Sequence, residues 1–212
     1  MKPTFSHVTL QVLLLLCALL AFSCKEDKEE DPAPDTTNQL EYNGQKYTFK
    51  SGLVEDYGPL SVFGTTNTHH NYDFTILDGT FTKQADNSYA PTSASSTVMV
   101  FAELFSPGTA GFTTGTFTHI APTDNDDDDL NDTELESKYK NKAYFNYALV
   151  FIDSNNNKTL EQTDIILIAT GGTIKVSGSA ANPTLEYNLT LHDGKTLTGS
   201  YTGGFTYSDE TD

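Results

Sequence analysis

Oxygen-bearing side chains recur along residues 153–164 with a spacing that could coordinate a hard cation. They stand at positions one, three, five, nine and twelve of this segment, and the backbone carbonyl of position seven adds a further oxygen. Calcium prefers such ligands and takes about six to eight of them. The alternative is an asparagine-rich connection between strands, because asparagine tolerates left-handed turns. The candidate calcium ligands are Asp153, Asn155, Asn157, the Thr159 carbonyl, Glu161 and Asp164.

This segment resembles the calcium-binding loop of EF-hand proteins, with Leu160 at the eighth position. It departs from that loop in three ways. Lys158 stands where the glycine of the sharp turn is expected, Asp164 is shorter than the bidentate glutamate, and positions three and five are neutral asparagines. The flanking residues read as strands instead of helices, so the resemblance covers the loop alone. It implies a calcium site of low affinity whose occupation raises the melting temperature.

Catalytic side chains are sparse elsewhere in the chain. The Gly-x-Ser-x-Gly motif, the phosphate-binding loop and the zinc-protease motif do not occur. His69 and His70 are adjacent in the polar stretch 65–71, where we expect a solvated loop; on a strand they would point to opposite faces and rarely share a metal ion. We therefore predict that the protein is not an enzyme and has no certain cofactor, with calcium as the one candidate.

Acidic residues crowd a second segment, between residues 124 and 136. The run 124–132 is a second possible calcium locus, but its consecutive aspartates repel one another and lack a preset geometry for a cation, so we expect a solvated loop there. An interaction patch for a basic partner is the alternative. The residues concerned are Asp124, Asp126, Asp127, Asp128, Asp129, Asp132, Glu134 and Glu136.

The first residues have the layout of a secretory signal. Lys2 supplies positive charge, an apolar run extends from Val12 to Phe22, and the small residue Ser23 precedes Cys24. The apolar run is shorter than the roughly 20 residues that a membrane-spanning helix needs. We predict that residues 1–23 are a signal peptide.

The residues Ala21, Ser23 and Cys24 resemble the lipobox of bacterial lipoproteins, in which small residues precede a cysteine that is acylated and becomes the first residue of the mature protein. Cys17 follows four leucines, which do not fit that pattern. The resemblance implies that Cys24 carries the lipid and anchors the protein to a membrane. Each buried methylene of an acyl chain contributes about 0.8 kcal/mol to such anchoring.

An acidic cluster comes directly after Cys24 and resembles the export signal of Bacteroidetes-type surface lipoproteins. That resemblance implies display on the outer face of the outer membrane, and the periplasmic face is the alternative. Residues 24–39 are mostly polar and bear two prolines, so we expect a flexible tether. Asp35-Thr36-Thr37 resembles the O-glycosylation acceptor of the same group, which implies a glycan on Thr36.

Charge limits the partners of the protein. The chain of 212 residues has 12 basic residues, all of them lysine, and 29 acidic residues, which gives a formal net charge of -17. Such a surface repels nucleic acid and anionic lipid headgroups. We therefore expect no nucleic-acid partner. A glycan or a neighbouring outer-membrane protein is the expected partner.

Residues 40–212 have the length of one domain, and their apolar residues alternate with polar ones in short runs such as 98–105 and 145–152. Clusters of Gly, Asn, Asp, Ser and Pro separate these runs. The pattern predicts one all-β domain, a single antiparallel β-sandwich; a calycin-like β-barrel is the alternative. The capping-box pattern from Thr133 to Glu136 predicts one or two helical turns, or a loop.

The C-terminal residues predict a hairpin of defined register. Residues 185–191 place alternate side chains on an apolar face, and a continuous strand over 197–207 does the same. A two-residue turn would mismatch every pair. A three-residue loop over 192–194 instead sets Leu189 opposite Leu197 and gives its glycine the left-handed position of a bulge.

These expectations favour a tethered, non-catalytic binding or accessory module. A lipocalin-like carrier of a small apolar ligand is the alternative. The 13 phenylalanines and 11 tyrosines suit either function, since exposed rings stack on sugars and buried rings line cavities. A filled core with aromatic residues exposed at one edge would favour the binding module, and a hollow interior would favour the carrier.

Overall fold

The computed structural model describes residues 37–92, 96–121, 127, 129–179 and 182–211. The predicted signal peptide 1–23, Cys24 and Thr36 lie outside these residues. The described residues form thirteen strands and one helix, and none of their helices is long and apolar enough to cross a membrane. The elements are β1 (Gln39–Tyr42), β2 (Gln45–Thr48), β3 (Ser51–Leu60), β4 (His69–Leu77), β5 (Phe81–Lys83), β6 (Tyr89–Pro91), β7 (Val98–Pro107), β8 (Gly115–His119), α2 (Asp132–Tyr139), β9 (Tyr144–Ile152), β10 (Ile165–Ser179), β11 (Asn182–Leu191), β12 (Thr196–Thr202) and β13 (Phe205–Asp209).

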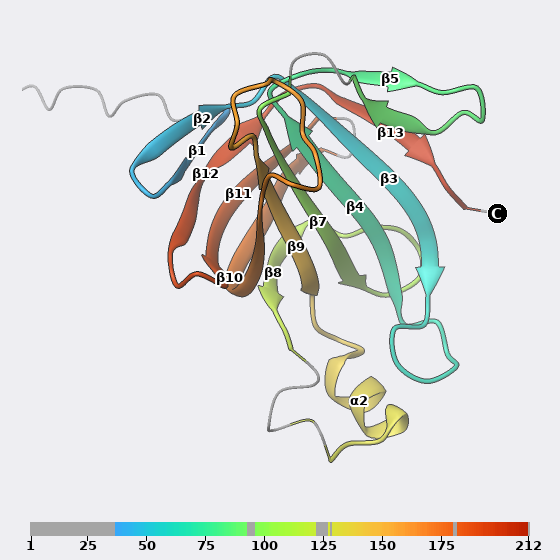
Figure 1. Cartoon of the computed structure of the whole chain (residues 1–212). Coiled ribbons are helices and arrows are strands. Elements are labelled where there is room, and N and C mark those ends of the chain that lie inside the picture. Colours follow the sequence, from blue (N-terminus) through green and yellow to red (C-terminus); the bar gives the residue numbers. More distant parts are fainter. Residues whose placement is uncertain (1–36, 93–95, 122–126, 128, 180–181, 212) are drawn as a thin grey trace, which may run out of the picture. The chain divides into compact units, whose positions relative to one another are not determined.

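Eleven of these strands belong to one sheet, with the order β13-β3-β4-β7-β9-β8-β10-β11-β12-β1-β2, while β5 and β6 form a separate hairpin. The large sheet curls into a half-barrel (Figure 1). The all-β prediction is confirmed. The sheet is mixed, however, because β13 pairs with β3 in parallel and β8 pairs with β9 in parallel. All eleven strands also belong to one continuous sheet and are not divided between two antiparallel sheets.

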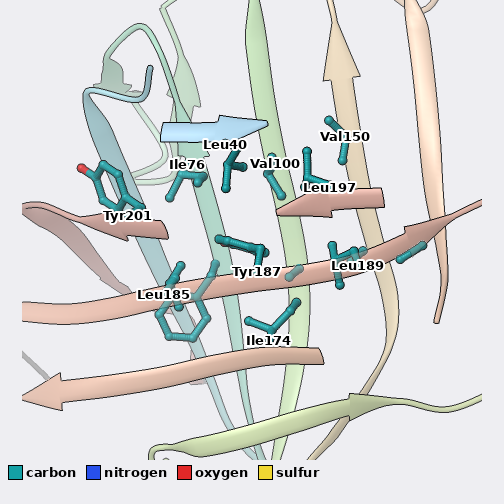
Figure 2. Close-up of a cluster of buried hydrophobic side chains, with 14 of the residues drawn as sticks. Leu40, Ile76, Val100, Val150, Ile174, Leu185, Tyr187, Leu189, Leu197 and Tyr201 are labelled. Atoms are coloured by element: carbon teal, nitrogen blue, oxygen red, sulfur yellow. The ribbon is translucent and has the colours of Figure 1, made fainter. Parts of the chain in front are cut away.

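Curling brings two halves of the same sheet face to face across an apolar core. Figure 2 shows β1, β11 and β12 crossing over β4, β7 and β9, with aliphatic side chains from both halves between them. Each fully buried aliphatic side chain contributes about 1.5–3 kcal/mol to folding. The labelled residues that are buried in this core are Leu40, Ile76, Val100, Val150, Ile174, Leu185, Tyr187, Leu189, Leu197 and Tyr201.

The hairpin of β11 and β12 has the register that the sequence predicts. Leu189 pairs with Leu197, and Leu185 pairs with Tyr201. The Leu191 N–H donates to the carbonyl of Lys195 at 2.8 Å, which closes a three-residue loop. Gly194 in that loop has a φ of 78°, the left-handed conformation that glycine adopts without strain.

The expected continuous strand over residues 197–207 is wrong, because it divides into β12 and β13 at Gly203 and Gly204. A Cβ atom at Gly203 would lie 2.3 Å from the hydroxyl oxygen of Tyr201, so this position has no room for a side chain. The chain leaves β12 there and crosses to the opposite edge of the sheet, where β13 pairs with β3.

Helix α2 confirms the expected short helix, but its cap begins two residues earlier than the sequence pattern indicates. Asn131 is the N-cap and accepts hydrogen bonds from the N–H groups of Thr133 (3.0 Å) and Glu134 (3.2 Å). The carboxylate of Glu134 accepts the Asn131 N–H at 2.9 Å, which completes the capping box. Asparagine competes well with threonine at this position, which explains the shift.

The two adjacent histidines are not in a solvated loop, as we expected, but at the start of β4. His69 is 1% exposed and His70 is 8% exposed. His69 contacts the rings of Phe105 and Tyr144 near α2, and its Nε2 lies 3.2 Å from the carbonyl of Lys142. Both histidines can be buried because each ring has a polar contact, His69 with the Lys142 carbonyl and His70 with the Asp56 carboxylate. The two side chains take opposite faces of the strand, so they do not form a metal site together.

Candidate functional site

The predicted calcium segment 153–164 joins β9 to β10, and its side-chain oxygens bind its own backbone. The carboxylate of Asp153 accepts the N–H groups of Asn155 (3.1 Å) and Lys158 (2.8 Å). The side chains of Asn155 and Asn157 each accept the N–H two residues further on, at 2.8 Å. Lys158 has a φ of 64°, so it takes the left-handed conformation that an EF-hand loop gives to glycine.

The last candidate ligand, Asp164, closes the segment. Its carboxylate accepts the backbone N–H groups of Ser154 (3.0 Å) and Glu161 (2.8 Å), and these bonds hold the pKa of Asp164 below its usual range. Within the described residues, no three His, Cys, Asp or Glu side chains form a group that could hold a metal ion. Calcium binding by this segment stays a prediction.

The acidic segment between residues 124 and 136 contributes to α2. The carboxylate of Asp127 pairs with Lys138 and accepts the hydroxyl of Tyr139, and the bonds from Lys138 and Tyr139 lower its pKa. These contacts tie the helix to the segment before it. The interaction patch that we considered includes residues outside the described part of the chain, namely Asp124, Asp126 and Asp128.

An aromatic cleft of about 260 Å³ lies between β3 and β4 on one side and the ends of β10 and β11 on the other. Three aromatic side chains and three serine or threonine side chains line it, and none of the lining residues is charged. The lining residues are Val54, Tyr72, Phe74, Phe112, Thr113, Thr114, Val176, Ser179 and Pro183.

Stacking holds Phe112 in place, although this residue lies in the connection between β7 and β8. Its ring is parallel to that of Tyr72 (centroids 4.3 Å apart, 3° between planes) and to that of Phe117 (5.4 Å, 8°). The next residue, Thr113, donates its N–H to the hydroxyl of the buried Ser106 at 3.1 Å. The connection is therefore fixed to the sheet at two consecutive residues.

A buried carboxylate supports the Tyr72 side of the cleft. Asp56 accepts hydrogen bonds from the Tyr207 hydroxyl and from the Gly58 N–H, both at 2.8 Å, and its Oδ1 lies 2.8 Å from Nε2 of His70. Burial and the negative charge of Asp56 raise the pKa of Tyr72 to about 12. The Tyr72 phenol is therefore neutral at physiological pH and can take part in hydrogen bonds.

This arrangement suits the binding of a small ligand. The side chains of the cleft are aromatic, aliphatic or hydroxylic, and the Asp56 and His70 pair is engaged in bonds that hold strands together. Aromatic walls beside hydroxyl groups suit a ligand with one apolar face and a hydroxyl-bearing rim.

Sequence reasoning missed the cleft because its residues are far apart in the chain. Tyr72 and Phe74 read as ordinary strand residues, and Phe112 is a single aromatic residue in a connection rich in glycine and threonine. That isolated aromatic residue is the one available signal.

No protein-family model, no curated protein and no solved structure matches this chain.

Proposed function

We propose that this chain is a lipid-anchored lipoprotein of the outer membrane, displayed at the cell surface, and that its all-β unit binds a glycan in the aromatic cleft without catalysing a reaction. The observation that carries this proposal is the cleft itself, in which aromatic rings and hydroxyl groups converge.

A sugar ring matches the chemistry of the cleft. Its C–H groups can pack against Tyr72, Phe74 and Phe112, while its hydroxyl groups can bond to Thr113 and Thr114. The absence of charged side chains among the lining residues favours a neutral ligand. The volume is just below the range of about 300–1,000 Å³ for small-molecule sites, which suits one terminal sugar unit.

The filled interior of the curled sheet supports a binding module over an apolar carrier. The two halves of the sheet act as the layers of a sandwich, and side chains such as Tyr187, Leu189 and Val150 occupy the space between them. A carrier needs that space for its ligand.

The anchor and the charge of the chain support its location. Ser23 and Cys24 fit a lipidation site, and the acidic residues that follow fit an export signal for surface display. The net charge of -17 on the full chain favours a tethered domain that stays in solution and away from anionic headgroups. The cleft would then face the medium in which glycans are met.

The test is binding of glycans by the full lipidated chain in detergent micelles. A panel of neutral and acidic oligosaccharides is screened, and the affinity for each positive glycan is measured by titration calorimetry. We expect a neutral glycan to bind, Phe112→Ala to weaken it at least about tenfold, or 1.4 kcal/mol, and Thr114→Val to weaken it while keeping the shape of the cleft.

The matched control is Tyr147→Ala, which removes an exposed aromatic side chain outside the cleft and should leave the affinity unchanged. If no glycan binds, or if Phe112→Ala binds as the parent does, the glycan proposal is wrong. Binding of a fluorescent fatty acid with displacement by other apolar molecules would instead support the carrier.

A further inference from the structure

The face of the sheet opposite the core carries an apolar patch. In β7, β9 and β10 the residues paired with one another form two rows, Phe101, Leu149 and Ile168 in one and Met99, Phe151 and Ile166 in the other. We call these six residues the outer patch. None of them is buried, and Ile168 is 42% exposed. Apolar side chains that adjoin one another on an open sheet face mark an interaction site more often than single exposed ones do.

A row of carboxylates borders this patch. Glu55 on β3 pairs with Asp73 on β4, and Asp73 pairs with Glu103 on β7, so three acids stand side by side on the same face. Glu103 is followed in the row by Tyr147 on β9, whose ring contacts Phe101 of the outer patch at 6.1 Å. Like charges directly opposite one another on neighbouring strands destabilise a sheet.

Among the described residues no ion pair compensates this row, and the Asn71 amide, 3.5 Å from the Asp73 carboxylate, brings a hydrogen bond but no charge. The four ion pairs found there involve other acids, and none of them includes Glu55, Asp73 or Glu103. Burial and the charges on Glu103 and Glu55 raise the pKa of Asp73, which is the effect expected where a cation is missing. The cost would be recovered if a partner brought positive charge to the row.

We infer that the outer patch and the carboxylate row form a docking surface for a protein partner that presents lysine or arginine side chains beside apolar ones. The apolar part would bury the six patch residues, and the basic part would pair with the three carboxylates. This surface is separate from the aromatic cleft, because its residues lie on the other face of β4 and β7, and it does not depend on the proposed function.

Charge distinguishes this partner from the other occupants of an apolar sheet face. A second copy of the chain, docked through the same face, would set one carboxylate row near the other, and the net charge of -17 on each copy opposes that approach. An anionic membrane surface is repelled in the same way. A basic and apolar protein surface gains from both parts of the docking surface.

The experiment uses the full chain in detergent micelles and a synthetic peptide that alternates lysine with valine as the probe. Fluorescence anisotropy of the labelled peptide should give saturable binding that weakens as salt rises. The triple variant Glu55→Gln, Asp73→Asn, Glu103→Gln should bind at least tenfold more weakly. It should fold, since it removes repulsion. Phe101→Ser should weaken binding with all three carboxylates present.

The matched control is a triple variant that loses the same charge outside the docking surface, Glu41→Gln, Asp129→Asn, Glu161→Gln. It should bind the lysine-valine peptide as the parent does. Equal loss in both triple variants would show attraction to net charge alone and would overturn the inference. Equal binding of a peptide that alternates glutamate with valine, binding to anionic vesicles, or dimer formation abolished by Phe101→Ser would overturn it too. Phe112→Ala in the cleft should leave peptide binding unchanged, which separates this test from that of the proposed function.

Discussion

His70 and Asp56 lie side by side on β4 and β3, with Nε2 of the histidine 2.8 Å from Oδ1 of the carboxylate. The other carboxylate oxygen accepts the hydroxyl of Tyr207 on β13 at 2.8 Å. A single buried aspartate therefore links three neighbouring strands at the edge of the sheet.

The first prediction concerns this aspartate. Asp56→Ala should lower the free energy of unfolding by about 3 kcal/mol, because it leaves the His70 ring and the Gly58 N–H without their acceptor. Tyr207→Phe removes only the hydrogen bond from the Tyr207 hydroxyl to Asp56, and it should lower the free energy of unfolding by about 1 kcal/mol. Urea unfolding of both variants measures the difference, and equal costs would contradict the central place of Asp56.

A second prediction compares two buried tyrosines on paired strands. The Tyr187 hydroxyl has no hydrogen-bond partner among the described residues, whereas the Tyr201 hydroxyl donates to the carbonyl of Gly204 at 3.2 Å. Tyr187→Phe should therefore raise the free energy of unfolding by about 1 kcal/mol, and Tyr201→Phe should lower it by a similar amount. Thermal unfolding of the two variants distinguishes them, and the same sign for both would refute this account.

The third prediction is a dependence of stability on pH. Burial and the charges on Glu103 and Glu55 raise the pKa of Asp73 from 3.8 to about 7. The folded state thus holds this proton more tightly than the unfolded state, so Asp73 lowers the free energy of unfolding as pH rises from about 4 to about 7. Asp73→Asn should flatten that decrease and add on the order of 2 kcal/mol above pH 7, allowing for the partial exposure of the side chain.

Urea unfolding at several pH values measures this slope. The control is Glu186→Gln, whose carboxylate is exposed and paired with Lys175. If the parent and Asp73→Asn show the same slope between pH 4 and pH 7, the carboxylate row does not hold the proton that we assign to it.

Calcium is the subject of the fourth prediction. At about 100 times its dissociation constant, calcium should add roughly 2.7 kcal/mol to stability and raise the melting temperature, and chelator should reverse the rise. Asp153→Ala should abolish the response. It should also lower the melting temperature without calcium, because the Asp153 carboxylate holds the N–H groups of Asn155 and Lys158.

The control for calcium is Asp86→Ala, which removes a similar turn aspartate that accepts the Ser88 N–H in another loop. It should keep the calcium response. A melting temperature that calcium in millimolar excess leaves unchanged would make segment 153–164 an asparagine-rich turn and nothing more.

The fifth prediction concerns the anchor. Cys24→Ala should give an unlipidated protein that is recovered in the soluble exported fraction. In the parent, mass spectrometry should find an acylated N-terminal Cys24, and protease added to intact cells should remove the domain. An unmodified Cys24 thiol would refute the anchor, and protection from protease until lysis would place the domain on the periplasmic face.

Features fixed by neighbours in the chain could be predicted from the sequence. The register of β11 and β12 follows from alternation and from the three-residue loop, and the short helix follows from its capping residues. The contact of Asp56 with His70 and the pairing of β13 with β3 could not be predicted in this way, because no period in the sequence records which distant strands become neighbours. For the same reason, the sequence does not indicate that Phe112 stacks on the ring of Tyr72.

The crossing at Gly203 and Gly204 sets an order of events during synthesis. Tyr207 reaches Asp56 across 151 residues of chain, so β13 can take its place only after nearly all of the described chain has left the ribosome. Until then β3 is an open edge, with unpaired backbone groups that invite other chains. A nascent protein stalled before Phe205 would leave the edge of β3 unpaired, and completion of β13 would cover it and become the edge strand in its place.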